Sequence, residues 1–140
     1  MYAPHARMTS TAFLEAYRRC MDETASSGKN EAMFIPALVC AAFSAEVGLK
    51  ALLLQAGKAA RGHDLVRLFN RLPDELQLDI FGRMSMEASQ FAANLNHVRD
   101  AFKDWRYMYE FNDERFISVA FVSNFAAAVA AANPLNRAAA

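Results

Sequence analysis

The apolar pattern of residues 91–110, FAANLNHVRDAFKDWRYMYE, constrains the fold of this chain more than any other segment. Its large apolar side chains recur at alternating intervals of four and three residues, which places them on one face of an α-helix. They are Phe91, Leu95, Val98, Phe102, Trp105 and Tyr109. A second row at the same intervals is formed by Arg99, Lys103, Arg106 and Glu110. The pattern predicts one long helix whose buried aromatic face is bordered by a mainly basic row.

The rest of the chain also has helical periodicity and few helix-breaking residues. Only five glycines and four prolines occur among 140 residues, of which 54% are apolar. Capping and turn residues predict a first helix that begins within residues 9–11 and ends within 26–28, and others over about 31–55, 64–72 and 76–84. A last helix, capped by Asn112, is expected to bury Phe116, Ile117, Ala120, Phe121 and Phe125. The segment 85–90 has no strong breaker, which leaves open whether two of these helices are continuous. We therefore predict an all-α protein.

Length and composition bound the organisation of the chain. We predict one domain over residues 1–140, with a core over about 9–133 and flexible tails at 1–8 and 134–140. Fifteen basic residues balance fifteen acidic ones, so net charge favours no class of partner. Cys20 and Cys40 lack metal-type spacing and are expected to be reduced thiols. The sequence has no Glu-x-x-His pair, Cys/His cluster or glycine-rich phosphate loop, so we predict no cofactor and no metal.

The most apolar segment, residues 32–54, is long enough to raise the question of a membrane span. It is interrupted by Pro36, Ser44, Glu46 and Lys50, and two charges near the middle of a span are costly. The N-terminal residues lack the apolar stretch of a secretory signal. We therefore expect a cytoplasmic protein that does not use a membrane.

Glu46 is the most unusual charged residue in this apolar segment. Lys50 stands four residues later, in the favourable orientation for a helical ion pair. Because the neighbouring positions are apolar, Glu46 would be costly to bury without a further cationic partner. We expect that partner to be Arg106 or Arg99, and the sequence does not decide between them.

Three segments together resemble the HEPN family of prokaryotic helical-bundle proteins. They are SAEVGLKALL at residues 44–53, GHDL at 62–65 followed by Leu68 and Phe69, and WRYMYE at 105–110. The resemblance implies an up-and-down bundle of four to five helices that forms a homodimer. It also implies a role in toxin–antitoxin, anti-phage or RNA-processing systems. Active members are metal-independent ribonucleases that use an arginine followed, after four to six residues, by a histidine.

This chain departs from the nuclease pattern. Counted from Arg99 the relevant positions hold Asp104, Trp105 and Arg106, and counted from Arg106 they hold Phe111, Asn112 and Asp113. The missing histidine is the residue expected to move a proton during cleavage. We therefore predict a non-catalytic homodimeric module that binds RNA, a nucleotide or a partner protein. The expected binding residues are Arg99, Lys103, Arg106 and Tyr107, and the expected structural residues are Glu46, Lys50, His63, Tyr109 and Glu110.

Two alternatives remain open from the sequence. In the first, the chain is a metal-independent endoribonuclease, in which Arg99 or Arg106 stabilises the transition state and His63 or Tyr107 replaces the missing acid or base. In the second, it is a structural adaptor or antitoxin-type bundle that binds a cognate protein. Apart from catalysis, His63 is expected to cap or orient the start of its short helix, and Arg106 to form an ion pair with Glu46 or Glu110.

Overall fold

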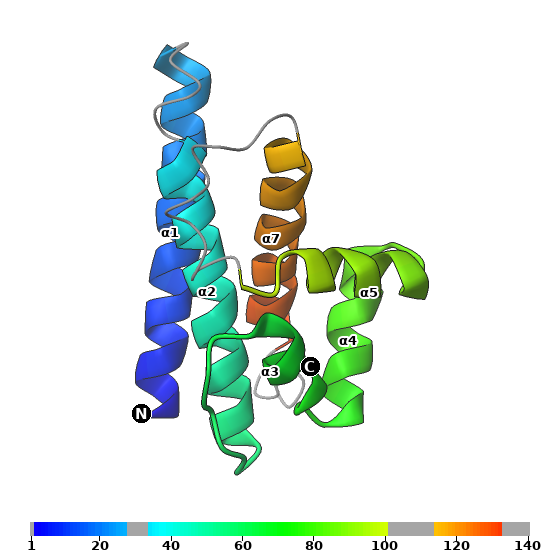
Figure 1. Cartoon of the computed structure of the whole chain (residues 1–140). Coiled ribbons are helices and arrows are strands. Elements are labelled where there is room, and N and C mark those ends of the chain that lie inside the picture. The colour runs from blue at the N-terminus through cyan, green and yellow to red at the C-terminus, as the bar shows by residue number, and fades with distance from the viewer. Residues whose placement is uncertain (1, 28–33, 101–113, 133–140) are drawn as a thin grey trace.

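The computed structural model describes residues 2–27, 34–100 and 114–132, and this part of the chain is a bundle of helices without strands (Figure 1). Four long helices are aligned with the bundle, and the colour gradient shows that successive ones alternate in direction. They are α1 (Ala3–Ser27), α2 (Phe34–Gln55), α4 (Asp74–Met84) and α7 (Glu114–Ala131). The short α3 (Leu65–Asn70) and the crossing α5 (Ala88–His97) complete the described helices. The predicted all-α, up-and-down bundle is confirmed.

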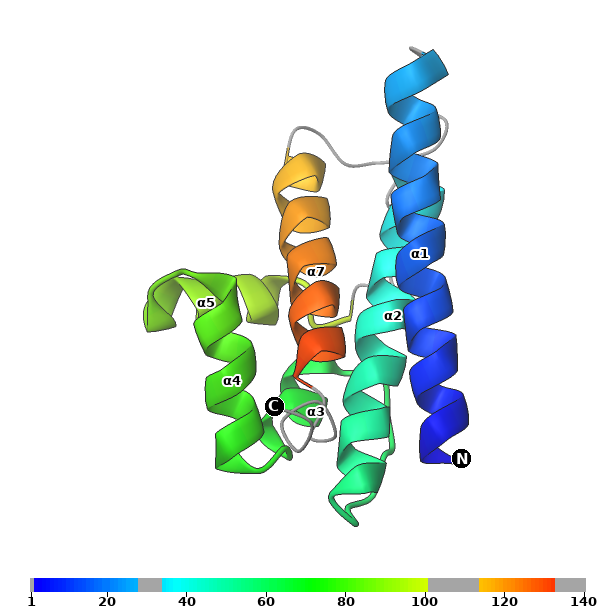
Figure 2. The same ribbon diagram turned by 180° about the vertical axis from the view of Figure 1, so that it is seen from behind.

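Helix α2 is the central element of the bundle. It packs against α1, α7 and α3, and α7 in turn contacts α4 (Figure 2). Leu49 and Leu53 of α2 and Phe125 of α7 are fully buried in the main core. By length and composition, residues Ile35–Gln55 would suffice to cross a membrane, but 78% of that window is buried inside the bundle. This burial is what the core helix of a globular domain shows.

Helices α1 and α2 are joined by polar contacts inside an otherwise apolar interface. Ser10 Oγ donates to the backbone oxygen of Ser44 at 2.7 Å, and Ser44 Oγ donates to the backbone oxygen of Ser10 at 2.7 Å. Nearby, the rings of Phe13 and Phe43 meet edge to face with centroids 4.5 Å apart. Both serines are buried, so each hydroxyl is satisfied by the opposite helix.

The ends of α3 and α4 follow the capping signals in the sequence. Asp64 is the N-cap of α3, and its carboxylate accepts from the backbone N–H groups of Val66 and Arg67. Pro73 precedes α4, whose first turn is acidic. Ser85 ends α4 in the left-handed conformation, with φ of 54°. This residue separates α4 from α5, so the two helices on either side of residues 85–90 are not continuous.

The prediction of one unbroken helix over residues 91–110 is wrong, because α5 ends at His97. Phe91, Leu95 and Val98 are buried as predicted. Beyond α5, the backbone oxygen of Arg99 accepts from the N–H of Leu65 at 2.9 Å, so this carbonyl serves the start of α3. The predicted helix positions after Asp100 lie outside the described residues.

Two further predictions are corrected at the other ends of the chain. A tail was expected over residues 1–8, whereas α1 begins at Ala3 and Ala6 is buried beside Val47 and Ala51. The small alanine side chain allows α1 to continue along α2 at this end. In α7, Phe121 and Phe125 are buried, but Ala120 is exposed because it lies on the outer side of that helix.

Candidate functional site: a basic groove beside a buried carboxylate

The loop between α2 and α3 brings charged residues against the side of α2. Gly57 and Gly62 flank the basic part of the loop, and both have positive φ, 73° and 93°. Such conformations are favourable for glycine and strained for other residues. Lys58 Nζ donates to the backbone oxygen of Arg71 at 2.8 Å, and Arg71 Nη1 donates to the backbone oxygen of Arg61 at 3.1 Å. These two contacts fix the loop against the end of α3.

Glu46 lies under this loop and is almost completely buried, with 1% of the residue exposed. Its carboxylate is 3.3 Å from Nζ of Lys50, one turn along α2. Nδ1 of His63 lies 3.1 Å and 3.2 Å from the two carboxylate oxygens. An ionised carboxylate only accepts hydrogen bonds, so the tautomer of His63 that pairs with it is the one that carries the proton on Nδ1. In the neutral imidazole, Nε2 then has an unprotonated lone pair.

A second ion pair holds the start of α3 to the end of α5. Arg99 donates from Nε and Nη2 to Oδ2 of Asp64, at 3.0 Å and 2.7 Å, and from Nη1 to Asn96 Oδ1 at 2.9 Å. Burial acts to raise the pKa of Asp64, but the bonds from Arg99 and from the backbone of Arg67 and Val66 outweigh it and lower the pKa. The hydrogen bond to Asp64 raises the pKa of Arg99. Asp64 therefore remains anionic and its charge is compensated by Arg99.

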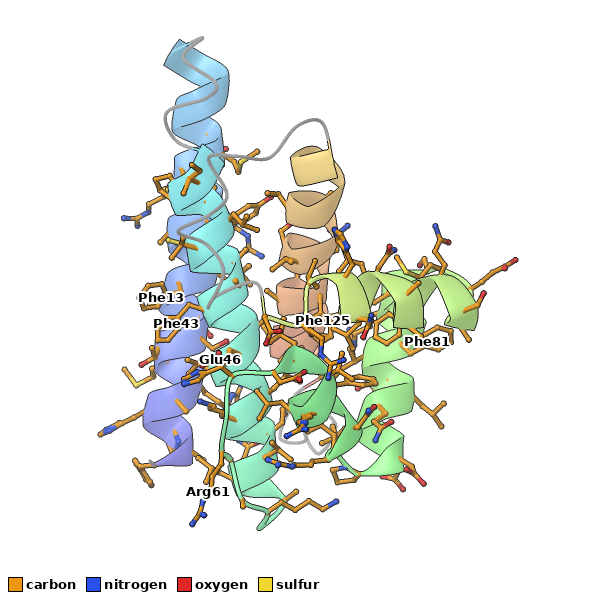
Figure 3. The ribbon with its side chains drawn as sticks, in the orientation of Figure 1. Phe13, Phe43, Glu46, Arg61, Phe81 and Phe125 are labelled. Atoms are coloured by element: carbon orange, nitrogen blue, oxygen red, sulfur yellow. The ribbon has the colours of Figure 1, made fainter. Side chains whose placement is uncertain are left out.

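These residues surround a polar groove of about 520 Å³, which we call the basic groove. Its lining residues are Arg61, Gly62, His63, Asp64, Arg67, Arg71 and Asp100. The side chains of Arg61 and Arg67 are exposed and form no ion pair with any described residue. Arg99 compensates the charge of Asp64. The other charged lining residues are three arginines and the single carboxylate of Asp100, so the groove is cationic. Figure 3 shows Arg61 in the loop and Glu46 on α2 above it.

Of the predicted site residues, His63 lines this groove, and Glu46 and Arg99 each contact a residue that lines it. Arg99 binds Asp64 and not Glu46, whose described partners are Lys50 and His63. Asp64, not His63, caps α3. Lys103, Arg106, Tyr107, Tyr109 and Glu110 lie outside the described residues, so the predicted contact between Glu46 and Arg106 stays a prediction.

The sequence analysis named none of the three groove arginines, Arg61, Arg67 and Arg71, as a binding residue. Arg67 and Arg71 are four residues apart at the surface of α3 and in the turn after it, a spacing that also occurs on ordinary solvated helices. A signal was present in Lys58 and Arg61, two basic residues between two glycines, followed by a basic helix. Among the residues that the structure describes, no group of three or more His, Cys, Asp or Glu side chains is arranged to hold a metal ion.

The comparison with protein families gives one result. The family described as HEPN domain matches residues 23–126, well over half of the chain, and the match contains both the buried Glu46 and the basic groove. No curated protein and no solved structure matches the chain.

Proposed function

This chain belongs to the HEPN domain family, and we propose that it is a non-catalytic module of that family that binds RNA through the basic groove. The observation that carries this proposal is the position of Arg61 and Arg67, which are exposed at one groove and unpaired within the described chain. Guanidinium groups bind phosphate oxygens in bidentate geometry. An electrically neutral chain that gathers arginines at one groove provides a local site for a polyanion.

The residues around the groove that are already paired stabilise its shape and charge without contacting the ligand. Asp64 would repel a phosphate, but its charge is compensated by Arg99. Lys58 and Arg71 use hydrogen bonds to backbone oxygens to hold the loop in place. We assign Arg99 to this positioning role, because three of its nitrogens are already engaged by Asp64 and Asn96.

We also propose that the protein is a cytoplasmic homodimer in a prokaryotic stress, defence or toxin–antitoxin context. This part of the proposal is supported by family membership, since HEPN domains commonly dimerise. Light scattering of the purified protein measures the oligomeric state directly.

Reversal of the groove charge should weaken RNA binding. We expect the double variant Arg61→Glu/Arg67→Glu to bind a fluorescein-labelled single-stranded RNA of mixed sequence at least tenfold more weakly than the parent, as measured by fluorescence anisotropy. Each lost phosphate contact should also reduce the slope of log K against log salt by about 0.7.

The matched control is Arg18→Glu/Arg19→Glu, which makes the same change of charge at exposed positions of α1. It should bind RNA within about twofold of the parent at physiological salt, where distant surface charges are screened. Equal weakening by both double variants would mean that only net charge matters, and would refute the groove as the binding site. Failure of the parent to bind RNA would refute the proposed function itself.

A second function is favoured by the contact between Glu46 and His63. A buried carboxylate that binds Nδ1 orients an imidazole so that Nε2 accepts a proton, which is the arrangement of a general base. In the basic groove, Nε2 would take the proton of an RNA 2′-hydroxyl as its oxygen attacks the phosphorus. The 5′-oxygen then leaves with a proton from the solvent, and a groove arginine stabilises the charge on phosphorus. This is the metal-independent endoribonuclease alternative with His63 in the role that the sequence analysis gave to His63 or Tyr107, and with a groove arginine in place of Arg99 or Arg106.

This second function predicts cleavage of RNA in the presence of EDTA, with products that end in a 2′,3′-cyclic phosphate. His63→Ala should lower the rate about 100-fold or more, which is the usual contribution of a positioned base. His97→Ala is the matched control, because His97 is exposed at the end of α5 and should not matter. No cleavage by the parent across varied RNAs would leave only the non-catalytic function.

A further inference from the structure

A second groove lies between α4 and α5 and differs from the basic groove in character. It has a volume of about 440 Å³, within the range of protein sites that hold ligand groups. Five of its seven lining residues are apolar: Phe69, Leu78, Phe81, Ala88 and Phe91. Asp74 and Gln77 complete the lining. Figure 3 shows Phe81 where α4 meets α5, away from Arg61 in the α2–α3 loop.

The inner wall of this groove is aromatic and held in place. The ring centroid of Phe91 lies 5.3 Å from that of Phe69 and 5.5 Å from that of Phe81, both in edge-to-face contact. Gln77 directs its side-chain amide to the backbone oxygens of Leu72 and Asn70, at 2.8 Å and 3.2 Å. The amide nitrogen is thus engaged by the backbone, and the groove offers mainly apolar contact to an incoming group.

Leu78 stands at the edge of the groove and is 68% exposed. Most of the large apolar residues in the described chain are buried, and only Tyr2 and Met8 are similarly exposed. An exposed leucine beside an aromatic wall forms a continuous apolar surface, which is a common feature of protein-binding sites.

The charged residues near this groove are acidic. Asp74 lines it, Glu75 follows in the first turn of α4, and Glu87 precedes Ala88 at the start of α5; all three are exposed. The nearest basic residue on α4, Arg83, is bound to Asp79 at 2.9 Å. The groove therefore combines an apolar wall with negatively charged ends.

We propose that this acidic-ended apolar groove binds a basic amphipathic helix of a partner protein. Leucine or phenylalanine side chains at every third and fourth position would fill the groove along Phe81 and Leu78. Lysine or arginine side chains on the flanks would face Asp74 and Glu87. The charge of the groove ends selects this partner over an RNA, which the same acidic residues repel.

A fluorescein-labelled peptide of leucine and lysine, with leucines at helical spacing, tests the proposal on the full chain. We expect saturable binding by fluorescence anisotropy and at least tenfold weaker binding by Leu78→Asp. Met8→Asp is the matched control, because Met8 is 71% exposed on α1, and it should bind the peptide like the parent. The same peptide with glutamate in place of lysine should not bind.

Three outcomes would overturn the proposal. Unchanged peptide binding by Leu78→Asp would show that the groove is not the site. Equal binding of the lysine and glutamate peptides would show that the acidic residues do not select the partner. Conversion of a dimer to a monomer by Leu78→Asp, seen by light scattering, would mean that a second copy of this chain covers the groove. The peptide test does not depend on RNA binding, so failure of one proposal leaves the other standing.

Discussion

Glu46→Ala is expected to lower the free energy of unfolding by about 3–5 kcal/mol, the usual cost of removing one partner from a buried ion pair. Nζ of Lys50 would lose the only anionic partner that the described chain gives it, with 10% of its side chain exposed. His63 would also lose the acceptor for its Nδ1 proton. Equilibrium unfolding in urea, followed by circular dichroism, measures the change.

The chain provides a matched control on α1. Glu15 also forms a helical ion pair, with Arg19 at 3.5 Å, but its side chain is 51% exposed. Glu15→Ala should therefore cost less than about 1 kcal/mol. A third variant, Glu46→Gln, keeps the shape of the side chain and one acceptor oxygen and should fall between the two. A cost for Glu46→Ala similar to that of Glu15→Ala would show that the buried pair does not stabilise the fold.

The second large effect is expected from one methyl group at Gly48. A Cβ at this position would lie 2.8 Å from Ser10 Oγ and 2.8 Å from Val129 Cγ1, closer than packed atoms allow. Ser10 Oγ is bound to the backbone of Ser44, and the side chain of Val129 is stiff, so neither moves easily. Gly48→Ala should destabilise the protein by about 1–3 kcal/mol, as overpacking of a core does.

The same substitution at Gly82 should have the opposite sign. A Cβ there meets no atom within 4 Å, and the residue lies inside α4. Gly82→Ala should stabilise the protein by about 0.4–1 kcal/mol, because alanine restricts the unfolded chain without strain in the folded one. Thermal unfolding of both variants compares the two signs. Stabilisation by both would show that α1, α2 and α7 are more loosely packed around Gly48 than the structure indicates.

The parts of the fold that local sequence determines could be predicted. Asp64 and Pro73 mark helix starts through their own backbone and side-chain chemistry, and the end of α2 at Gln55 follows from Gly57. The end of α5 could not be predicted, because it depends on a hydrogen bond from Leu65 to the backbone of Arg99. That bond joins residues far apart in the sequence, and the apolar spacing of residues 91–110 carries no trace of it.

In the candidate site too, the features set by residues close in sequence could be predicted, and those set by contacts distant in sequence could not. The apolar surroundings of Glu46 correctly indicated that it needs a partner, since the cost of a buried charge depends on its near neighbours. Which group supplies it depends on how the α2–α3 loop folds back, which brings Nδ1 of His63 to 3.1 Å from the carboxylate. The basic groove exists only because that fold-back brings Arg61 beside Arg71.

The paired bonds between Ser10 and Ser44 determine how far α1 is displaced along α2. Alanine-rich helices present nearly uniform surfaces, on which several alignments bury similar apolar area. A slip of one turn, about 5.4 Å, would break both bonds and separate the two buried hydroxyls from these acceptors. Two small polar side chains thus favour one alignment of α1 along α2, in which each hydroxyl meets a carbonyl of the opposite helix.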